Sequence, residues 1–340
     1  MLTTLGLVEL REQVWRQGRG KTWRALSRAL RVNPRGESPR LARALVDFGA
    51  DHAFAPAAAK VQEHYGVEVS ASRVSRVCYR TAAKIAAPNA GGGLPAQGPD
   101  WIVAQTDGTM IPMVTTSGAP AGADRRKHRK ICWQEMRLAA ARPLGSATTT
   151  YACSRGDVVA AGTAWAQAVN DSGRALSTRI HTVGDGAPWI EAQSRVQFGH
   201  SGRYLLDLYH VCDYLAAAAP DTAAPGPYLT LSKTRLCAGA AKEVIAELAA
   251  RREPPELPDQ AAPVRVAHRY LSNRLDQLDY PAALAAGLPI GSGLIEGSHR
   301  FVLQARLKKP GAWWDPSHAD AIANLRVLRA NGQWLTLWRN

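Results

Sequence analysis

The sequence predicts an α/β protein with a mixed sheet, an all-helical insertion in that sheet, and a small helical N-terminal region before it. Between Trp101 and Tyr214 the apolar patterns follow the order strand, strand, strand, helix, strand, helix, strand. Residues 215–288 show mostly helical patterns with proline-rich joints, as expected of an insertion. Residues 87–100 are rich in proline and glycine, which predicts a linker and a domain boundary. Three consecutive strands followed by alternation predict a mixed sheet, and this pattern alone leaves several α/β folds open.

The first part of the N-terminal region, residues 1–33, has two runs of alternating apolar and polar residues. They flank a glycine-bearing turn at 17–20, which predicts a small hairpin, although the second run also fits a helix. Ser38 and Pro39 then provide the start of a helix. We expect residues 1–86 as a whole to form a DNA-binding region.

Two helical patterns separated by a glycine predict a helix-turn-helix at about 54–85. The first pattern spans 56–65, Gly66 breaks it, and Ser70 is a candidate N-cap for a helix over 71–85. The second helix of such a motif enters the major groove of DNA. Its basic residues are therefore candidate DNA contacts: Arg73, Arg76 and Arg80. Any helical hairpin gives similar spacing, and the basicity of the chain favours the DNA-binding interpretation.

The charge of the chain favours a polyanionic partner. Lys and Arg number 42 against 28 Asp and Glu, which gives a formal net charge of +14 and a pI near 9.9. Guanidinium groups are well suited to phosphate oxygens. A GC-rich genome, which raises the arginine and alanine content of all its proteins, is the alternative explanation.

Length, hydropathy and cysteine content exclude other classes. At 340 residues the chain is long enough for two or more compact units. Its apolar runs fall short of the ~18 residues that span a membrane, and the N-terminus lacks a cleavable apolar segment. The five cysteines are scattered and odd in number, which argues against a disulfide framework and against a structural zinc site. We therefore expect a cytoplasmic protein.

Two acids follow predicted strands and lie beside glycines. The strand over 178–183 leads to Asp185 between two glycines, and the strand over 101–106 leads to Asp107 followed by a glycine. In open α/β sheets ligands bind outside the carboxyl ends of the strands, and glycines allow a metal or phosphate to approach the backbone. Both acids are candidate metal ligands, although an Asp-Gly pair also commonly shapes a turn. A third acid, Glu296, lies near the start of a predicted helix.

Three carboxylates brought together would suit two Mg²⁺ ions, with Mn²⁺ as a possible substitute, because these ions prefer carboxylate, water and phosphate oxygens. Two such ions about 3.5–4 Å apart activate a water or a 3′-hydroxyl and stabilise the leaving oxygen during in-line displacement at a phosphodiester. The expected reaction is therefore cleavage and transfer of nucleic-acid strands.

Five segments occur in a fixed order from about Trp101 to the C-terminus. They are Asp107-Gly-Thr, Gly184-Asp-Gly-Ala-Pro-Trp-Ile, Leu206-Asp-Leu-Tyr-His-Val, Leu288-Pro-Ile-Gly-Ser-Gly-Leu-Ile-Glu and Arg306-Leu-Lys. Each is a weak signal alone, but together they resemble the DDE transposases of bacterial insertion sequences related to the Mutator group. Residues 1–50 lack the cysteine pairs that such relatives often carry, so cysteine ligands for a metal-stabilised end-binding module are missing there.

The resemblance implies a ribonuclease H-like catalytic domain over 101–340, interrupted by the helical insertion at about 215–288. It also implies which residues bind the two metal ions: Asp107, Asp185 and Glu296. The element Asp207-x-x-His210 is similar to one that follows the second catalytic Asp in that group, which implies that His210 lies near the scissile phosphate. Without the resemblance, Asp207 is explained as a helix cap and His210 as a partly buried imidazole.

Basic and aromatic residues follow Glu296. Three of the basic residues are candidate contacts to backbone phosphates, although a solvated helix face would look the same: Arg300, Arg306 and Lys308. Trp313 and Trp314 are better explained as core or domain-closing residues than as residues that stack on a base.

The leading functional expectation is a transposase that binds the inverted-repeat ends of its own element and target DNA, as a homodimer or higher oligomer, at the bacterial nucleoid. A non-catalytic DNA-binding regulator or domesticated remnant is the alternative from another class. A ribonuclease or junction nuclease on the same fold is the third possibility, because it differs in substrate and not in metal chemistry.

Overall fold

The structure, a computed structural model, describes residues 1–9, 11–18, 21–29, 36–85, 93–116, 122 and 124–338. The chain forms two compact units. The first unit contains Met1–Pro88, Ile111–Gln134 and Phe301–Asn340, and the second contains Asn89–Met110 and Glu135–Arg300. Two strands, β5 (Trp101–Thr115) and β6 (Lys130–Pro143), each pass from one unit to the other along the chain.

These units differ from the predicted division, in which 1–86 and 101–340 are separate domains. The C-terminal helix α14 (Pro316–Ala330) packs against the N-terminal helices of the first unit. Arg326 pairs with Asp51 at 2.5 Å, across 275 residues of sequence. The last part of the chain therefore completes the N-terminal unit. Of the predicted linker 87–100, residues 87–92 lie outside the described residues, and the rest contain no helix or strand.

The predicted helices of the first unit are confirmed. They are α2 (Pro39–Asp51), α3 (Phe54–Tyr65) and α4 (Ala71–Ala82), and each packs against the other two. Ser38 and Ser70 are the N-caps of α2 and α4, since each side-chain oxygen accepts a backbone amide at 3.2 Å. Gly66 ends α3 with a φ of 65°, a left-handed conformation that favours glycine.

Short strands precede these helices. β1 (Leu2–Thr3) pairs with β2 (Gly6–Leu7), and β3 (Val14–Gln17) pairs with β4 (Lys21–Arg24), both antiparallel. A short helix, α1 (Ala25–Ala29), follows β4. The pairing of β3 with β4 confirms the predicted hairpin, of which residues 19 and 20 lie outside the described residues, and its second run is strand first and helix afterwards.

The second unit is built on a mixed five-stranded sheet with the order β7-β6-β5-β8-β9. Its other strands are β7 (Thr150–Ser154), β8 (Arg179–Gly184) and β9 (Gly202–Leu206). β5 pairs with β8 and β8 pairs with β9 in parallel, whereas β6 pairs with β7 antiparallel. This arrangement confirms the prediction of an α/β protein with a mixed sheet.

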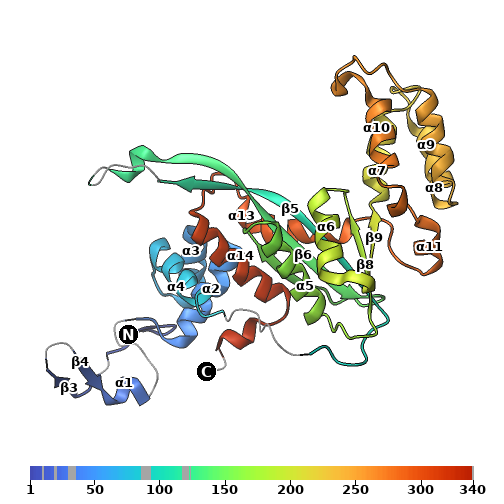
Figure 1. The fold of residues 1–340 in the computed structure, drawn as a ribbon. Helices are drawn as coiled ribbons and strands as arrows, with labels where there is room; N and C mark the ends of the chain where they lie inside the picture. The colour runs from blue at the N-terminus through green and yellow to red at the C-terminus, as the bar shows by residue number, and fades with distance from the viewer. Residues whose placement is uncertain are drawn as a thin grey trace. The chain divides into compact units, whose positions relative to one another are not determined.

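Helices cover both faces of this sheet (Figure 1). Alternate residues of β5 point to opposite faces. Ile102 and Ala104 pack with α5 (Val158–Asp171) and α6 (Pro188–Phe198), whereas Val103 packs with α7 (Leu208–Ala217) and the helices that follow it. Packing on both faces explains why β8 is buried from Ile180 to Gly184.

The predicted insertion is helical. It contains α8 (Gly226–Cys237), α9 (Ala241–Ala250), α10 (Pro263–Ser272) and α11 (Tyr280–Ala285), with short 3₁₀ turns at Asp259–Ala261 and Leu275–Gln277. Figure 1 shows α7, α8, α9 and α10 gathered into one helical group. The chain then forms α12 (Gly293–Ser298), a π-helix (His299–Gln304) and α13 (Ala305–Leu307). Within the described residues, none of these helices or the others has the length and apolar character needed to cross a membrane.

Candidate active site

Asp185 lies directly after a strand of the sheet, as the sequence predicts. β8 ends at Gly184, and α6 begins three residues after Asp185. Asp185 Oδ1 accepts a hydrogen bond from the amide of Ala187 at 2.9 Å, so the side chain also shapes the turn. The residue is half-buried. This geometry is compatible with both interpretations of Asp185, as a turn residue and as a metal ligand.

The turn after Asp185 is fixed by three side chains. The hydroxyl of Tyr204 accepts the amide of Gly186 at 3.0 Å, and the hydroxyl of Tyr270 donates to the carbonyl of Asp185 at 2.6 Å. Arg274 donates to the carbonyl of Gly186 at 2.8 Å. Gly186 has a φ of +81°, and a Cβ there would lie 2.8–2.9 Å from Arg274 and Tyr270. Strand β9 and the helical insertion therefore both hold the Asp185 turn in place.

Asp107 lies in the interior of β5, which corrects the prediction that a strand ends there. β5 runs without interruption from Trp101 to Thr115. Gly108 lies within this strand and does not form a turn. A Cβ at this position would lie only 1.9 Å from the carboxylate of Glu135 on β6. The glycine makes room for a neighbouring acid, and strand pairing overrides the local preference of an Asp-Gly pair for a turn.

Other acids surround the Asp107 carboxylate. Burial raises the pKa of Asp107 to about 6, and the negative charges of Asp185 and Glu135 contribute to this shift. The amide of Gly108, which donates to Asp107 Oδ1 at 2.6 Å, and the charge of His210 act in the opposite direction. Asp107, Asp185 and His210 are therefore close enough to influence one another electrostatically.

Glu296 lies in the first turn of α12, as predicted, and is exposed. Ser292 Oγ lies 3.3 Å from Glu296 Oε1, and the same hydroxyl donates to Asp207 Oδ2. His299, one turn after Glu296, brings its Nε2 within 3.9 Å of Asp107 Oδ2. The segment that carries Glu296 therefore contacts both Asp207 and Asp107.

Asp207 is fully buried and caps α7, as one of the two interpretations of this residue predicts. It accepts hydrogen bonds from the amide of Tyr209 at 2.7 Å, from the amide of Ser292 at 3.1 Å and from the Ser292 hydroxyl. Burial acts to raise its pKa, but the hydrogen bonds from His210 and Ser292 outweigh burial and lower the pKa below its ordinary value. The role of Asp207 in this structure is to position the residues around it.

His210 extends from the first turn of α7 with 40% of its side chain exposed. Its Nδ1 lies 3.2 Å from Asp207 Oδ2. This hydrogen bond raises the pKa of His210 to about 9, with Asp185 contributing, so the ring is an imidazolium at neutral pH. An imidazolium donates hydrogen bonds and cannot ligate a metal. His210 is therefore suited to contacting a phosphate oxygen.

One possible metal cluster in the described residues consists of Asp207, His210 and Glu296, whose ligand atoms lie within 4.8 Å of one another. The charged His210 and the hydrogen-bonded Asp207 make this set a poor site while Asp207 holds the imidazolium. Carboxylate oxygens suit Mg²⁺, and the predicted ligands Asp107, Asp185 and Glu296 would provide them. Among the described residues these three do not form a group with all ligand atoms within 4.8 Å of one another. The mutual repulsion of Asp107 and Asp185 is also the kind that a bound cation relieves.

Three successive strands hold the segment before Glu296. From β5, Gln105 Nε2 donates to the carbonyl of Gly291 at 3.0 Å, and Gln105 Oε1 accepts the amide of Ile295 at 3.0 Å. From β8, His181 Nε2 donates to the carbonyl of Pro289 at 2.8 Å. The end of β9 contributes Asp207, described above. Buried polar side chains thus determine where α12 begins relative to the sheet.

Sequence reasoning missed four of these residues: Gln105, Glu135, Ser292 and His299. Ser292 and His299 belong to the glycine-rich segment around Glu296, so the concentration of polar residues there was an available signal. Gln105 and Glu135 occupy ordinary positions in strands, and nothing in their local sequence distinguishes them.

The three arginines predicted to contact DNA from α4 differ in their surroundings. Arg73 and Arg80 both form ion pairs with Glu37 at 2.9 Å, and the Glu37 side chain is buried. Arg76 is exposed. Arg300 and Lys308 are also exposed, as phosphate contacts must be. Their contact with DNA stays a prediction.

Arg306 is buried, which corrects the prediction that it contacts a phosphate. Only 2% of the residue is exposed. Its guanidinium lies over the rings of Phe54 and Trp314, at 4.8 and 4.7 Å from their centroids, and donates to the carbonyl of Gly49 at 3.2 Å. The sequence analysis grouped Arg306 with neighbouring basic residues, and this grouping gave no indication that its side chain lies in the core of the first unit. Trp314 is likewise a core residue, as predicted, whereas Trp313 is 46% exposed, which corrects the same prediction for that residue.

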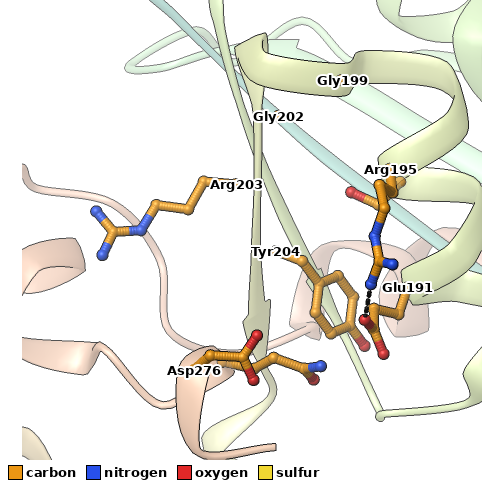
Figure 2. Close-up of a pocket in the computed structure, with 9 residues that line it drawn as sticks. Glu191, Arg195, Gly199, Gly202, Arg203, Tyr204 and Asp276 are labelled. Carbon is orange, nitrogen blue, oxygen red and sulfur yellow. Dashed lines mark hydrogen bonds and ion pairs between the residues drawn. The ribbon is translucent and has the colours of Figure 1, made fainter.

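A pocket of about 250 Å³ lies between α6, β9 and the 3₁₀ turn after α10 (Figure 2). Both of its arginines are paired: Arg195 bonds to Glu191 at 2.5 Å, as Figure 2 shows, and Arg203 pairs with Asp279. A further acid, Asp276, also lines the pocket. Neither arginine is therefore available to select an anion in this pocket. The candidate active site remains the group of acids around His210, which includes Asp107, Asp185 and Glu296.

Comparison with protein-family models and with curated proteins gave no match for this chain. The functional argument therefore depends on the residues and their geometry.

Proposed function

We propose that this protein is a DDE-type transposase with a ribonuclease H-like catalytic domain, which binds the inverted-repeat ends of an insertion sequence and catalyses DNA cleavage and strand transfer. The observation that supports this proposal is the grouping of acids from distant segments around one charged histidine. Asp107 and Asp185 influence each other electrostatically, and both interact with His210, whose ring lies near Glu296. Plain DNA binding gives no physical reason to gather carboxylates in this way.

The residues of the cluster have distinct tasks in this proposal. Asp107, Asp185 and Glu296 would hold two Mg²⁺ ions, or Mn²⁺ ions, which when bound activate the attacking oxygen and stabilise the leaving oxygen. His210, as an imidazolium, donates a hydrogen bond to a phosphate oxygen of the scissile group. Asp207 orients His210 and, through Ser292, the start of α12.

Helices α3 and α4 are the proposed reading element for duplex DNA ends, with the exposed Arg76 as a candidate phosphate contact. Strand transfer between two ends requires two active sites, so we propose a homodimer or higher oligomer on DNA. Such a protein would act at the nucleoid of a bacterial cytoplasm.

The test compares the wild type with Asp185→Asn on linear DNA that carries the inverted-repeat ends, with Mg²⁺ or Mn²⁺. We expect the variant to lose cleavage by at least about 100-fold, because removal of one carboxylate ligand disrupts the metal site. Asp171→Asn, an exposed carboxylate on α5, is the matched control and should cleave like the wild type. Equal cleavage by wild type and Asp185→Asn would refute the proposed site.

Two other functions on the same residues predict different results. A non-catalytic regulator would bind DNA in the presence of a chelator and would not nick it, whichever divalent ion is supplied. A ribonuclease H-like nuclease would prefer an RNA–DNA hybrid or a four-way junction to linear ends. The same preparation therefore distinguishes all three functions.

A further inference from the structure

The outer part of β6 and the turn before it carry a dense positive charge. Residues 125–134 contain five Lys or Arg and no Asp or Glu. Lys127, Arg129 and Lys130 are all exposed. A 3₁₀ turn, Arg125–His128, leads directly into the strand. Cations at this density repel one another unless a polyanion neutralises them.

Two large apolar side chains project from the same strand. Ile131 is 58% exposed and Trp133 is 56% exposed. Residues two apart on a strand share a face, so these two side chains lie side by side. Cys132 and Gln134, on the other face, are partly buried. An exposed Trp beside an exposed Ile, next to a group of cations, is an unusual composition for a surface without a partner.

This part of β6 extends beyond the end of β7, its neighbour on one side. β7 pairs with β6 only over Arg137–Ala141. The outer part of β5, in contrast, has a neighbour already, because the amide of Val114 donates to the carbonyl of Trp314 at 2.7 Å and the amide of Trp314 donates to the carbonyl of Pro112 at 3.2 Å. The surface available to a partner is therefore the segment Lys127–Trp133.

Charge decides which partner fits. A second copy of this chain that paired through the same strand would bring equal positive charges together, which is unfavourable. Duplex DNA offers phosphates for the cations and a groove for the apolar side chains. We infer that Lys127–Trp133 is a second DNA-binding surface, in which the cations bind phosphates on both sides of a groove and Ile131 and Trp133 insert into it.

This inference rests on the proposed function, because it takes DNA as the partner, and it adds a contact region separate from α3 and α4. Proteins that insert apolar side chains into a groove bend the duplex by about 20–90°. Phosphate contacts, in contrast, set the salt dependence of binding. The two kinds of contact can therefore be measured separately.

The cations are tested with a triple variant, Lys127→Ala, Arg129→Ala and Lys130→Ala, in the full chain. Duplex binding is measured by fluorescence anisotropy at several salt concentrations, with Ca²⁺ in place of Mg²⁺. We expect the slope of log K against log salt to decrease by about 2.7, since each phosphate contact contributes about 0.9. Lys242→Ala, an exposed lysine on α9, is the control and should shift the slope by less than one contact.

The apolar pair is tested with Trp133→Ala and Ile131→Ala, using energy transfer between dyes at the two ends of the duplex. We expect the wild type to bend the DNA and Trp133→Ala to lose most of the bend, with affinity reduced on the order of tenfold and the salt slope unchanged. Val159→Ala, an apolar side chain 59% exposed on α5, is the control. Unchanged unfolding temperatures show that all variants fold.

The outcomes separate this inference from the proposed function. If the wild type binds and cleaves DNA but the variants retain its salt slope and bend, the surface is refuted and the transposase proposal stands. If the variants change the sedimentation mass without DNA, the surface joins copies of the chain and the inference is refuted. If the wild type does not bind DNA, both proposals fail.

Discussion

Glu37 forms ion pairs with two arginines that the sequence predicts to contact DNA. Its carboxylate is buried and accepts hydrogen bonds from Arg73 and Arg80, both at 2.9 Å. Burial acts to raise the pKa of Glu37, but the hydrogen bonds from the arginines outweigh it, so the pKa lies below its ordinary value near 4.5. The ionised carboxylate therefore stabilises the first unit, and it does so by engaging side chains that were expected to face DNA.

The sign of this effect gives a pH prediction. Because the pKa of Glu37 is lower in the folded protein, its stabilisation is present above the ordinary pKa and is lost as the pH falls through the folded pKa. We expect Glu37→Gln to cost about 1 kcal/mol near neutral pH, a small value because both arginines reach solvent. The cost should vanish at acidic pH. Urea unfolding over a pH series measures it, and parallel stability curves for the two proteins would contradict the prediction.

Substitution of Arg76 should weaken DNA binding, whereas substitution of Arg73 should lower the stability of the fold. Arg76 is exposed, whereas Arg73 pairs with Glu37. We expect Arg76→Ala to weaken duplex binding uniformly across sequences and to reduce the salt slope by about one contact, with an unchanged unfolding temperature. Arg73→Ala should lower the unfolding temperature instead. Anisotropy and thermal unfolding of both variants test this, and the opposite assignment of effects would exclude Arg76 as the main contact on α4.

At the scale of the element, the short helix α12 depends on side chains from other elements for its position. Gln105 bonds to both sides of its first turn, to Gly291 and to Ile295. The residue is 1% exposed, so loss of these bonds leaves buried backbone groups without partners. A helix of this length has little stability of its own. The position of Glu296 is therefore determined largely by β5, the strand that carries Asp107.

Gln105→Leu tests this dependence. We expect DNA cleavage to fall about 100-fold in kcat with little change in KM, because a displaced Glu296 misplaces the reacting groups and leaves DNA contacts intact. Stability should fall by about 2 kcal/mol. Thr106→Val is the matched control. It removes the buried hydrogen bond that the Thr106 hydroxyl donates to the carbonyl of Leu138 at 3.0 Å, and this bond does not involve α12. A similar loss of kcat in both variants would mean that Gln105 acts through stability alone.

Elements were more predictable from the sequence than their ends or their partners. Serine caps and a glycine stop are local signals, and they gave α2, α3 and α4 correctly. Asp107 was placed at a strand end because an Asp-Gly pair favours a turn in isolation. Its actual environment depends on Glu135, which is 28 residues away in the sequence and adjacent in the sheet. Contacts of that kind leave no pattern in one sequence.

At the scale of the whole molecule, the N-terminal helices do not form a separate domain. Arg326 of α14 donates to the carbonyls of Val302 at 2.5 Å and Ala50 at 3.3 Å, and to Asp51. Arg329 pairs with Asp51 and with Asp47. No local pattern in the sequence links these arginines to Asp47 and Asp51, so the predicted boundary at the linker separated segments that the fold joins.

The last prediction concerns this assembly. A fragment of residues 1–88 lacks α14, whose apolar residues are buried in the complete chain: Ala319, Ile322, Ala323 and Leu325. The fragment therefore exposes the apolar surface of α2 and α4 and leaves Asp51 without its arginines. We expect it to show reduced helicity and no cooperative thermal transition by circular dichroism.

Addition of a peptide of residues 301–340 should restore helicity, because it returns both the apolar face and the ion pairs of α14. The same peptide with Arg326→Leu and Arg329→Leu is the control, since it keeps the apolar face and loses the pairing with Asp51. Cooperative unfolding of the fragment alone would show that the N-terminal helices are self-sufficient. In that case the C-terminal segment would only cover a domain that is already stable, and the proposed DNA binding by α3 and α4 would not require α14.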